Sequence, residues 1–502
     1  MANRQRILVV SDESGLGQGG VQTFNQELTE ALAKEHDVTL LTADPKTTRP
    51  HAGAKTLTID PAGDSKRDAL TKAAELDPRS YGLNDPQQEP YDLIIGHSRF
   101  SGPAAAALRE NWYPDARVAH FLHTSPERLD EVKGQPEKGA AKAAVEREVM
   151  QKADLVVGVG PLLTEEAQRL SAQGGGRLPD SHELVPGTGI EELVQHSGPK
   201  ERLNLLLMGR TDDPIKGVDD ALRAVRQLRR EGMDVHLTIR GANEETLAQV
   251  RGEAAALAGG AKAVTVLPRT DNKAELNNDI RNADAVIMPS RHEGFGLVAT
   301  EGAGHGVPIL VNEESGAARF LNDAKRVPPE IGRPCVVPEP PDPSMRPQAW
   351  ADAIHRLKDE LPQRQQNAVK LRETLKGYSW EHAARGLTDA AMRTTPATHQ
   401  QHTTHHQRRN ASVQAAYGEL ITEAPVAEGQ EAQEAREEFE VSEDLVELLG
   451  EDRPSLRDRL ANRAAAEPVT AQPVAAPPVI EGPALPPPLP QQGPGHTKGP
   501  SL

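Results

Sequence analysis

Cysteine is nearly absent from this chain of 502 residues, which contains one, Cys335. A single cysteine excludes an internal disulfide and any zinc site built mainly from cysteines. We expect Cys335 to be a small buried or loop residue rather than a nucleophile. Aromatic residues make up only 3% of the chain, and no basic patch with interleaved aromatics occurs. This composition argues against a nucleic-acid partner.

Long hydrophobic runs are also missing. No stretch approaches the roughly 18–20 consecutive apolar residues that a membrane helix needs. The apolar run at residues 7–10 follows a basic start, but it is too short for the core of a signal peptide and is ended by Ser11, Asp12 and Glu13. We therefore expect a buried first strand there, no transmembrane segment and a cytoplasmic protein.

The net charge of −17 is unevenly distributed. Residues 417–452 contain 13 acidic residues and one basic residue, so this stretch alone contributes −12. Residues 468–502 contain 11 prolines, too many for a packed core. We expect residues 396–502 to form a low-complexity acidic and proline-rich tail that is largely disordered.

Three features of this tail could bind a metal or a protein partner. Four histidines between residues 399 and 406 could hold a metal, but a solvated linker is the favoured interpretation. Residues 441–449 could form a short amphipathic helix, and residues 486–490 a polyproline II ligand. The tail is therefore a candidate contact for a protein partner.

Short aliphatic runs alternate with helical patterns through the first 395 residues, in two successive series. Continuous apolar runs suit strands of a parallel sheet that is covered on both faces. The expected strands of the first series are residues 6–10, 38–42, 55–59, 92–96, 117–122, 155–159 and an edge strand at 183–185. Those of the second series are residues 203–208, 235–240, 264–267, 285–288 and 308–311. Helices are expected at residues 21–34, 138–152, 218–231, 244–258, 347–361, 364–375 and 380–393.

This alternation predicts the α/β class, with two Rossmann-like domains facing each other across a cleft. We place the first domain at residues 1–195 and the second at residues 196–377. A C-terminal helix at residues 378–395 would pack back on the first domain.

A glycine-rich segment follows the first expected strand. Gly15, Gly17, Gly19 and Gly20 precede an expected helix, whose N-terminus would favour an anion. Their spacing does not match the dinucleotide-binding pattern G-x-G-x-x-G. A purely structural loop and a ligand-binding loop are equally compatible with this segment.

Two cations lie six positions apart on the loop that opens the second series. Arg210 and Lys216 follow the strand at residues 203–208 and precede a helix. An arginine can bind two phosphate oxygens side by side, while a lysine acts as a point charge. The pair can therefore converge on a diphosphate, although an ordinary solvated loop would explain it if it stood alone.

The most specific signal is a pair of carboxylates eight positions apart, Glu293 and Glu301, on either side of Gly294, Phe295 and Gly296. We expect Glu293 in the loop and Glu301 about two turns into the following helix, on nearly the same face. The helix N-terminus between them would offer N–H groups to a phosphate. The carboxylates would accept hydrogen bonds from sugar hydroxyls. Two solvated glutamates are the alternative.

Three histidines end strands of the first series, where a side chain can reach a ligand. His123 is assigned a function in the site, and His120 a structural role. For His97 both interpretations remain open.

Together these segments resemble family 4 (group 1) of the GT-B glycosyltransferases over roughly residues 5–394. The resemblance rests on these residues: Gly19, Gly20, Val21, Gln22, His123, Gly209, Arg210, Lys216, Gly217, the E-x7-E pair Glu293 and Glu301 within residues 289–301, Gly306, Val307, Pro308 and the segment 378–381. It implies two Rossmann-like domains, the first on the acceptor side and the second, nucleotide-sugar-binding domain holding most of the donor.

The resemblance also implies roles. Arg210 and Lys216 would neutralise the diphosphate leaving group, Glu301 would bind the ribose, and Glu293 would contact the transferred sugar. His123 would lie near the sugar and the acceptor. The remaining donor-binding residues would be Gly19 and Gly20, closing over the phosphates, and Gly294, Phe295, Gly296 and Leu297, assisting through the backbone.

The implied activity is transfer of a sugar, with retention of configuration, from a UDP-, GDP- or ADP-sugar to an unidentified acceptor. No metal or other cofactor would be needed. The alternatives are a non-enzymatic nucleotide-sugar sensor or scaffold, and an epimerase of the same fold.

Overall fold

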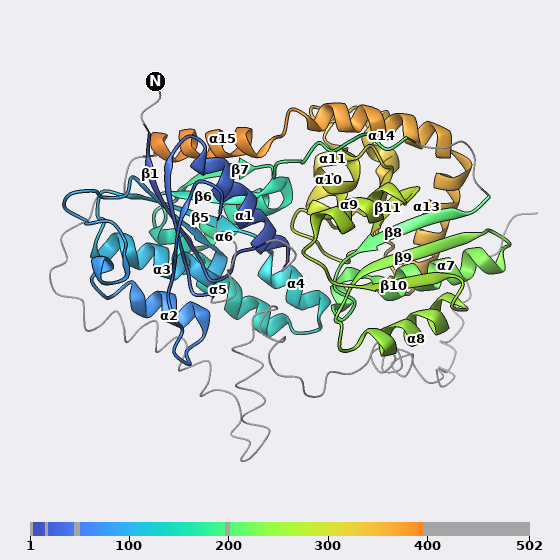
Figure 1. Ribbon diagram of the computed structural model, residues 1–502, viewed down its shortest axis with the longest axis horizontal. Coiled ribbons are helices and arrows are strands. Elements are labelled where there is room, and N and C mark those ends of the chain that lie inside the picture. Colours follow the sequence, from blue (N-terminus) through green and yellow to red (C-terminus); the bar gives the residue numbers. More distant parts are fainter. Residues whose placement is uncertain (1–3, 16–18, 45–50, 196–200, 395–502) are drawn as a thin grey trace, which may run out of the picture. The chain divides into compact units, whose positions relative to one another are not determined.

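The computed structural model describes residues 4–15, 19–44, 51–195 and 201–394 (Figure 1). The expectations for residues 396–502, including the histidine tract, the amphipathic helix and the proline-rich ligand, lie outside the described residues and stay predictions. Residues 16–18 of the glycine-rich segment lie outside them as well.

The first series forms a seven-stranded parallel sheet with the strand order β3-β2-β1-β4-β5-β6-β7. Its strands are β1 (Arg6–Ser11), β2 (Asp37–Thr42), β3 (Lys55–Thr58), β4 (Leu93–His97), β5 (Arg117–Leu122), β6 (Leu155–Val159) and β7 (Asp180–Leu184). The order reverses between β1 and β4, so ligands are expected at the carboxyl ends of these two strands.

Helices cover both faces of this sheet because its central strands are apolar on both sides. In β1, Ile7 and Val9 belong to one buried cluster, and Leu8 and Val10 to another. The helices of this half are α1 (Gly20–Ala33), α2 (Lys66–Ala73), α3 (Ser98–Asn111), α4 (Pro126–Val132), α5 (Pro136–Lys152) and α6 (Gly160–Gln173), with a 3-10 turn η1 (Pro78–Tyr81).

The second series forms a six-stranded parallel sheet with the order β10-β9-β8-β11-β12-β13. Its strands are β8 (Leu203–Met208), β9 (Val235–Ala242), β10 (Val264–Pro268), β11 (Ala285–Met288), β12 (Ile309–Asn312) and β13 (Val336–Val337). Its helices are α7 (Val218–Arg230), α8 (Leu247–Ala258), α9 (Lys273–Arg281), α10 (Leu297–Gly304), α11 (Gly316–Asn322), α12 (Pro329–Gly332), α13 (Arg346–Asp359) and α14 (Leu361–Leu375). Short 3-10 turns are η2 (Pro214–Lys216), η3 (Arg333–Cys335) and η4 (Pro343–Met345).

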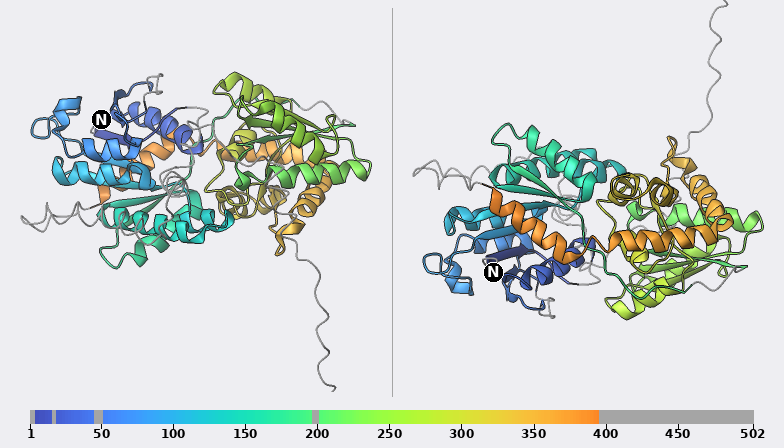
Figure 2. Two further views of the ribbon diagram at one scale, coloured as in Figure 1. Left: turned by 90° about the horizontal axis from the view of Figure 1, so that it is seen from below. Right: turned by 90° about the horizontal axis from the view of Figure 1, so that it is seen from above.

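The last helix, α15 (Trp380–Arg393), packs on α1, β5 and β7 of the first half (Figure 2). Ser379 caps it by accepting a hydrogen bond from His382 N. Its buried side includes Leu387 and Ala391, and the Trp380 ring meets Phe24 edge-on at 5.2 Å. The N-cap and the apolar stripe explain why this helix has the expected bounds.

Two parallel sheets flanked by helices confirm the expected fold class. Helices α3 and α6, with 14 residues each, were not expected. Among the strands, those at the sheet edges differ most from expectation. β7 lies at residues 180–184 instead of 183–185, because its sequence is largely polar and gives a weak strand pattern. β13 was not expected, because it has only two residues. None of the helices in the described ranges is both long and apolar enough to cross a membrane.

Candidate functional site

The centre of the site is an ion pair between two loops of the second half. Lys216 lies on the loop between β8 and α7, and Glu293 on the loop between β11 and α10. Lys216 Nζ donates to Glu293 Oε2 at 2.8 Å, and Ser290 Oγ donates to the same oxygen at 3.1 Å. Burial alone would lower the pKa of Lys216, but the nearby carboxylates of Glu293 and Asp213 outweigh it and raise that pKa. Lys216 is therefore a cation at neutral pH.

Arg210 joins this centre through a carboxylate that the sequence did not single out. Arg210 Nη2 donates to Asp213 Oδ2 at 2.8 Å, while Asp213 Oδ1 accepts from Ile215 N at 3.0 Å. Burial would raise the pKa of Asp213, but Arg210, Lys216 and Lys133, which follows α4, together lower it. Asp213 is thus bonded to Arg210 and close enough to Lys216 for the two to shift each other's pKa.

Helix α10 begins immediately after Glu293 and its glycines. Glu293 pairs with Ser315 as an isolated parallel bridge, with Gly316 N donating to Glu293 O at 3.1 Å. This pairing keeps residue 293 extended, and Gly296, at φ 102°, turns the chain into the helix. No side chain among the described residues caps α10, so its first N–H groups can serve an anion.

The expectation that Glu301 lies two turns into the helix is wrong. Because α10 starts only at Leu297, Glu301 is its fifth residue, little more than one turn from the start. Glu301 is half-buried, and burial raises the pKa of its carboxyl to about 6, with Glu27 of α1 adding to the shift and Lys273 opposing it. Glu27 and Lys273 were not expected here, since no local pattern marks them.

Gly294 and Phe295 have structural reasons for their identity. A Cβ at position 294 would lie 2.5 Å from the carbonyl oxygen of His123 and 2.8 Å from Leu163, so only glycine allows this contact. The Phe295 ring is buried, next to Gly160 and edge-on to Phe320. Phe295 can therefore offer a ligand its backbone but not its ring.

His123 is buried and bonded to His97. His123 Nε2 lies 2.9 Å from His97 Nδ1. Burial, together with neighbouring His120, lowers the pKa of His97 to about 3, and burial places the pKa of His123 well below its ordinary value. Both imidazoles are therefore neutral at pH 7. Ser98, in the left-handed region at φ 45°, accepts from His123 N at 3.2 Å and so links the start of α3 to His123.

His120 and the glycine-rich segment lie apart from the ion-pair centre. His120 Nε2 lies 2.9 Å from Glu146 Oε2, and Glu146 Oε1 accepts from Arg99 N, which makes His120 part of a buried network. Gly19 precedes α1 and Gly20 opens it. A Cβ at Gly20 would meet nothing within 4 Å, so there is open space beside it.

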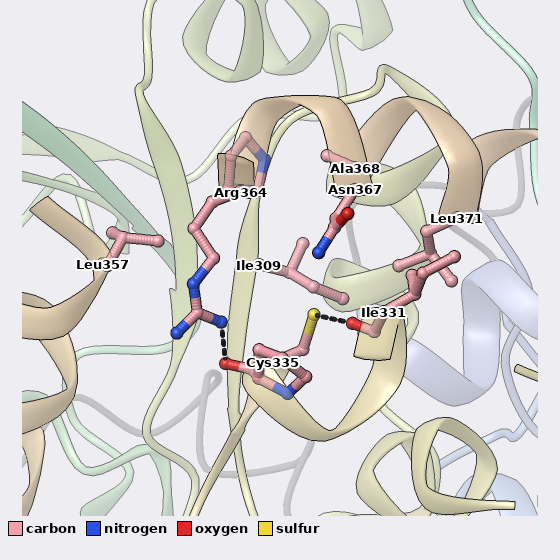
Figure 3. Close-up of a pocket in the computed structure, with 10 residues that line it drawn as sticks. Ile309, Ile331, Cys335, Leu357, Arg364, Asn367, Ala368 and Leu371 are labelled. Atoms are coloured by element: carbon pink, nitrogen blue, oxygen red, sulfur yellow. Dashed lines mark hydrogen bonds between the residues drawn. The ribbon is translucent and has the colours of Figure 1, made fainter. Parts of the chain in front are cut away.

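Cys335 lines a small cavity between α12, α13 and α14 (Figure 3). Its thiol donates to Ile331 O at 3.3 Å, and burial raises the pKa of this thiol to about 12. The cavity, about 10 Å³, scarcely admits one water. Cys335 stays protonated at neutral pH and has no room for a ligand beside it.

The structure thus unites Arg210, Lys216, Glu293 and the start of α10, and brings the His123 carbonyl against Gly294. Glu301 lies further along the same helix, in a separate set of charges with Lys273 and Glu27. The centre can bind a diphosphate through two cations and the N–H groups at the start of α10. Its carboxylates can accept hydrogen bonds from hydroxyl groups.

Two Rossmann-like sheets with this site at a strand-to-helix loop of the second define a glycosyltransferase of the GT-B class. The chain matches the family model described as "Family 4 Glycosyltransferase in conflict systems" over residues 8–387. It belongs to this family.

Curated relatives and solved structures agree with this assignment. The chain is 29% identical over 325 residues to D-inositol 3-phosphate glycosyltransferase of Corynebacterium diphtheriae, which covers 60% of this chain and 71% of the relative. It is 26% identical over 416 residues to the enzyme of the same name from Xylanimonas cellulosilytica, covering 76% and 94%.

Among solved structures, sucrose-phosphate synthase from Thermosynechococcus elongatus has a TM-score of 0.60 at 22% identity, covering 77% of this chain and 98% of that one. HepE from Anabaena, in complex with UDP and glucose, has a TM-score of 0.57 at 16% identity, covering 78% and 100%. These likenesses show the GT-B fold.

Proposed function

We propose that this glycosyltransferase transfers a sugar from a nucleoside diphosphate sugar to an acceptor hydroxyl, with retention of anomeric configuration. The observation that supports it best is the convergence of Lys216, Arg210 and the uncapped start of α10 beside the Glu293 carboxylate. Cations and N–H donors bind the oxygens of a diphosphate, and carboxylates accept hydrogen bonds from the hydroxyl groups of a sugar. The solved HepE structure, of the same fold, holds UDP and glucose.

Arg210 and Lys216 would stabilise the diphosphate as it leaves, because negative charge develops there as the glycosidic bond breaks. Lys216 is paired with Glu293. A bound diphosphate would become the second anionic partner of Lys216. We propose that these two cations provide the charge that a metal supplies in other transferases, so that no metal is required.

The other residues would orient the donor and acceptor. Glu293 would accept a hydrogen bond from the transferred sugar, and Glu301 from the ribose. Backbone groups of Gly294, Gly296 and Leu297 would assist. His123, being neutral, can donate or accept a hydrogen bond near the reacting centre but adds no charge there. Gly19 and Gly20 would close over the phosphates.

A thermal-shift panel of UDP-glucose, GDP-mannose and ADP-glucose tests the donor assignment. A ligand that binds only the folded state stabilises it by about 2.7 kcal/mol at a hundredfold excess over its Kd. We expect one base to raise the Tm clearly above the other two, and the matching free diphosphate to do the same. If none of the three shifts the Tm, the donor assignment is wrong.

Replacing Glu301 by glutamine should change stability and donor affinity in opposite directions. The pKa of the Glu301 carboxyl is raised from 4.5 in the unfolded chain to about 6 in the folded protein. Above pH 6, where the carboxyl is ionised in both, this shift lowers the free energy of unfolding by roughly 2 kcal/mol, and below pH 4.5 it has no such effect. The wild-type protein therefore loses stability relative to Glu301→Gln as pH rises from 4.5 through 6.

We expect Glu301→Gln to have a higher Tm than the wild type at pH 7.5 and a similar one near pH 4.5. Its Kd for the stabilising nucleotide should rise about tenfold or more, since hydrogen bonds to a charged group contribute about 1.5–3 kcal/mol. Glu75→Gln is the control, because Glu75 is an exposed residue in the turn after α2. A variant less stable than the wild type at pH 7.5, or one with unchanged Kd, would contradict this prediction.

A further inference from the structure

Arg291 lies two residues before Glu293, and its side chain reaches the first turn of α7. Its guanidinium donates through Nη2 to Asp219 Oδ1 at 2.6 Å and through Nε to Asp220 Oδ2 at 2.9 Å. All three side chains are at least 90% buried. Arg291 therefore joins the loop of Glu293 to the helix that follows Lys216.

The two loops are also locked along their backbones. Arg291 N donates to Ile215 O at 2.7 Å, one residue before Lys216. Gly217, one residue after it, has φ 64°, and a Cβ there would lie 2.1 Å from Pro289 O. The Glu293 loop therefore contacts the Lys216 loop on both sides of Lys216, at Ile215 and at Gly217. The Arg291 side chain adds a third contact, to the first turn of α7.

The chemistry of this third point requires an arginine. Asp219 and Asp220 are adjacent carboxylates in the first turn of α7, where the helix dipole favours negative charge but does not set the position of a neighbouring loop. A planar guanidinium with two parallel donors fixes both distance and orientation. A lysine ammonium neutralises the same charge without fixing a direction.

We propose that Arg291 is a positioning residue that sets the distance between the Lys216 ammonium and the Glu293 carboxylate, and so prepares the grip on the donor diphosphate. This inference rests on the proposed function, and the Arg291 guanidinium itself is bonded to Asp219 and Asp220. It acts by holding two loops in register. A displacement of about 1 Å between groups that act together can cost on the order of a hundredfold in rate.

The test compares Arg291→Lys and Arg291→Met with a matched control, Arg109→Met. Arg109 on α3 forms an equally buried ion pair in the first half, with Nη1 donating to Asp154 Oδ2 at 3.0 Å and side chains 5% and 0% exposed. For each variant the Tm and the Kd for UDP, GDP and ADP are measured. The Kd values are taken well below each Tm, so that every variant is folded.

We expect Arg291→Lys to keep a Tm close to that of the wild type, because the charge on Asp219 and Asp220 stays neutralised, while its Kd for the preferred diphosphate rises about tenfold. Arg291→Met should lower the Tm and raise the Kd further. Arg109→Met should lower the Tm comparably while its Kd stays within about twofold of the wild type.

Two outcomes overturn the inference: a wild-type Kd in Arg291→Lys, or a Kd in Arg109→Met that rises as much as in Arg291→Met. The first outcome would mean that position 291 needs only a positive charge. The second would mean that the loss of any buried ion pair weakens binding at the site. Failure of the proposed function looks different, because then the wild-type protein itself binds none of the three diphosphates.

Discussion

Replacing Lys216 by alanine is expected to lower kcat/KM by about 10³- to 10⁴-fold, the scale seen when a cation that stabilises a phosphate transition state is removed. Lys216 is half-buried, and its raised pKa keeps it charged throughout the neutral range. Its loss also leaves the Glu293 carboxylate without its lysine counterion. Donor hydrolysis, or transfer to an acceptor, measures the effect.

Lys72→Ala is the control for this variant, because Lys72 is an exposed helix residue paired with Asp64 in the first half. It should leave kcat/KM and Tm nearly unchanged. An alanine variant at 216 that retains more than about a tenth of wild-type kcat/KM would contradict the role given to Lys216. The expected loss corresponds to about 4–5.5 kcal/mol of transition-state stabilisation.

Glu293→Gln is expected to lower kcat/KM by about 10²-fold. The amide can still accept a hydrogen bond from a sugar hydroxyl, but it lacks the charge that makes such a bond strong. A second expected effect, on the pH dependence of activity, is specific to Glu293. Because the Glu293 carboxylate helps to raise the pKa of Lys216, removing its charge should lower that pKa. The alkaline limit of activity should therefore move to lower pH in the variant.

Glu314→Gln serves as the control, since Glu314 lies on the adjoining loop and pairs with Arg128 instead. It should leave the pH profile in place. A double variant of Lys216 and Glu293 should lose less than the product of the two single losses, because residues that act as a unit are not additive. An unshifted alkaline limit in Glu293→Gln would show that the two side chains do not share charge during turnover.

Local patterns predicted most of the fold. The aliphatic runs around Val9 and Leu206 lie in central strands, because only a sheet covered on both faces buries such runs. The helix at Trp380 was predicted with its bounds, since a serine cap and an apolar stripe mark it. The start of α10 was predicted too early in the chain, because the pairing of Glu293 with Ser315 extends the loop and shortens the helix.

The candidate site could be predicted only in part. Arg210, Lys216 and Glu293 were found because they flank strand ends and glycines, and the structure brings them together. Asp213 was missed because an aspartate in a loop resembles a solvated residue. The contacts of Arg291 with α7 and of His97 with His123 join residues distant in sequence, which no spacing reveals.

The amino-acid sequence alone determined the alternation of strands and helices, and therefore the class of fold, because periodicity is a local property of the chain. It also determined which charged residues stand at loops that begin helices. The tertiary structure alone decided which of these charges share a partner, how far α10 extends, and that the imidazoles of His97 and His123 are neutral. Those properties depend on burial and on distances between separate loops, and both arise only when the chain packs.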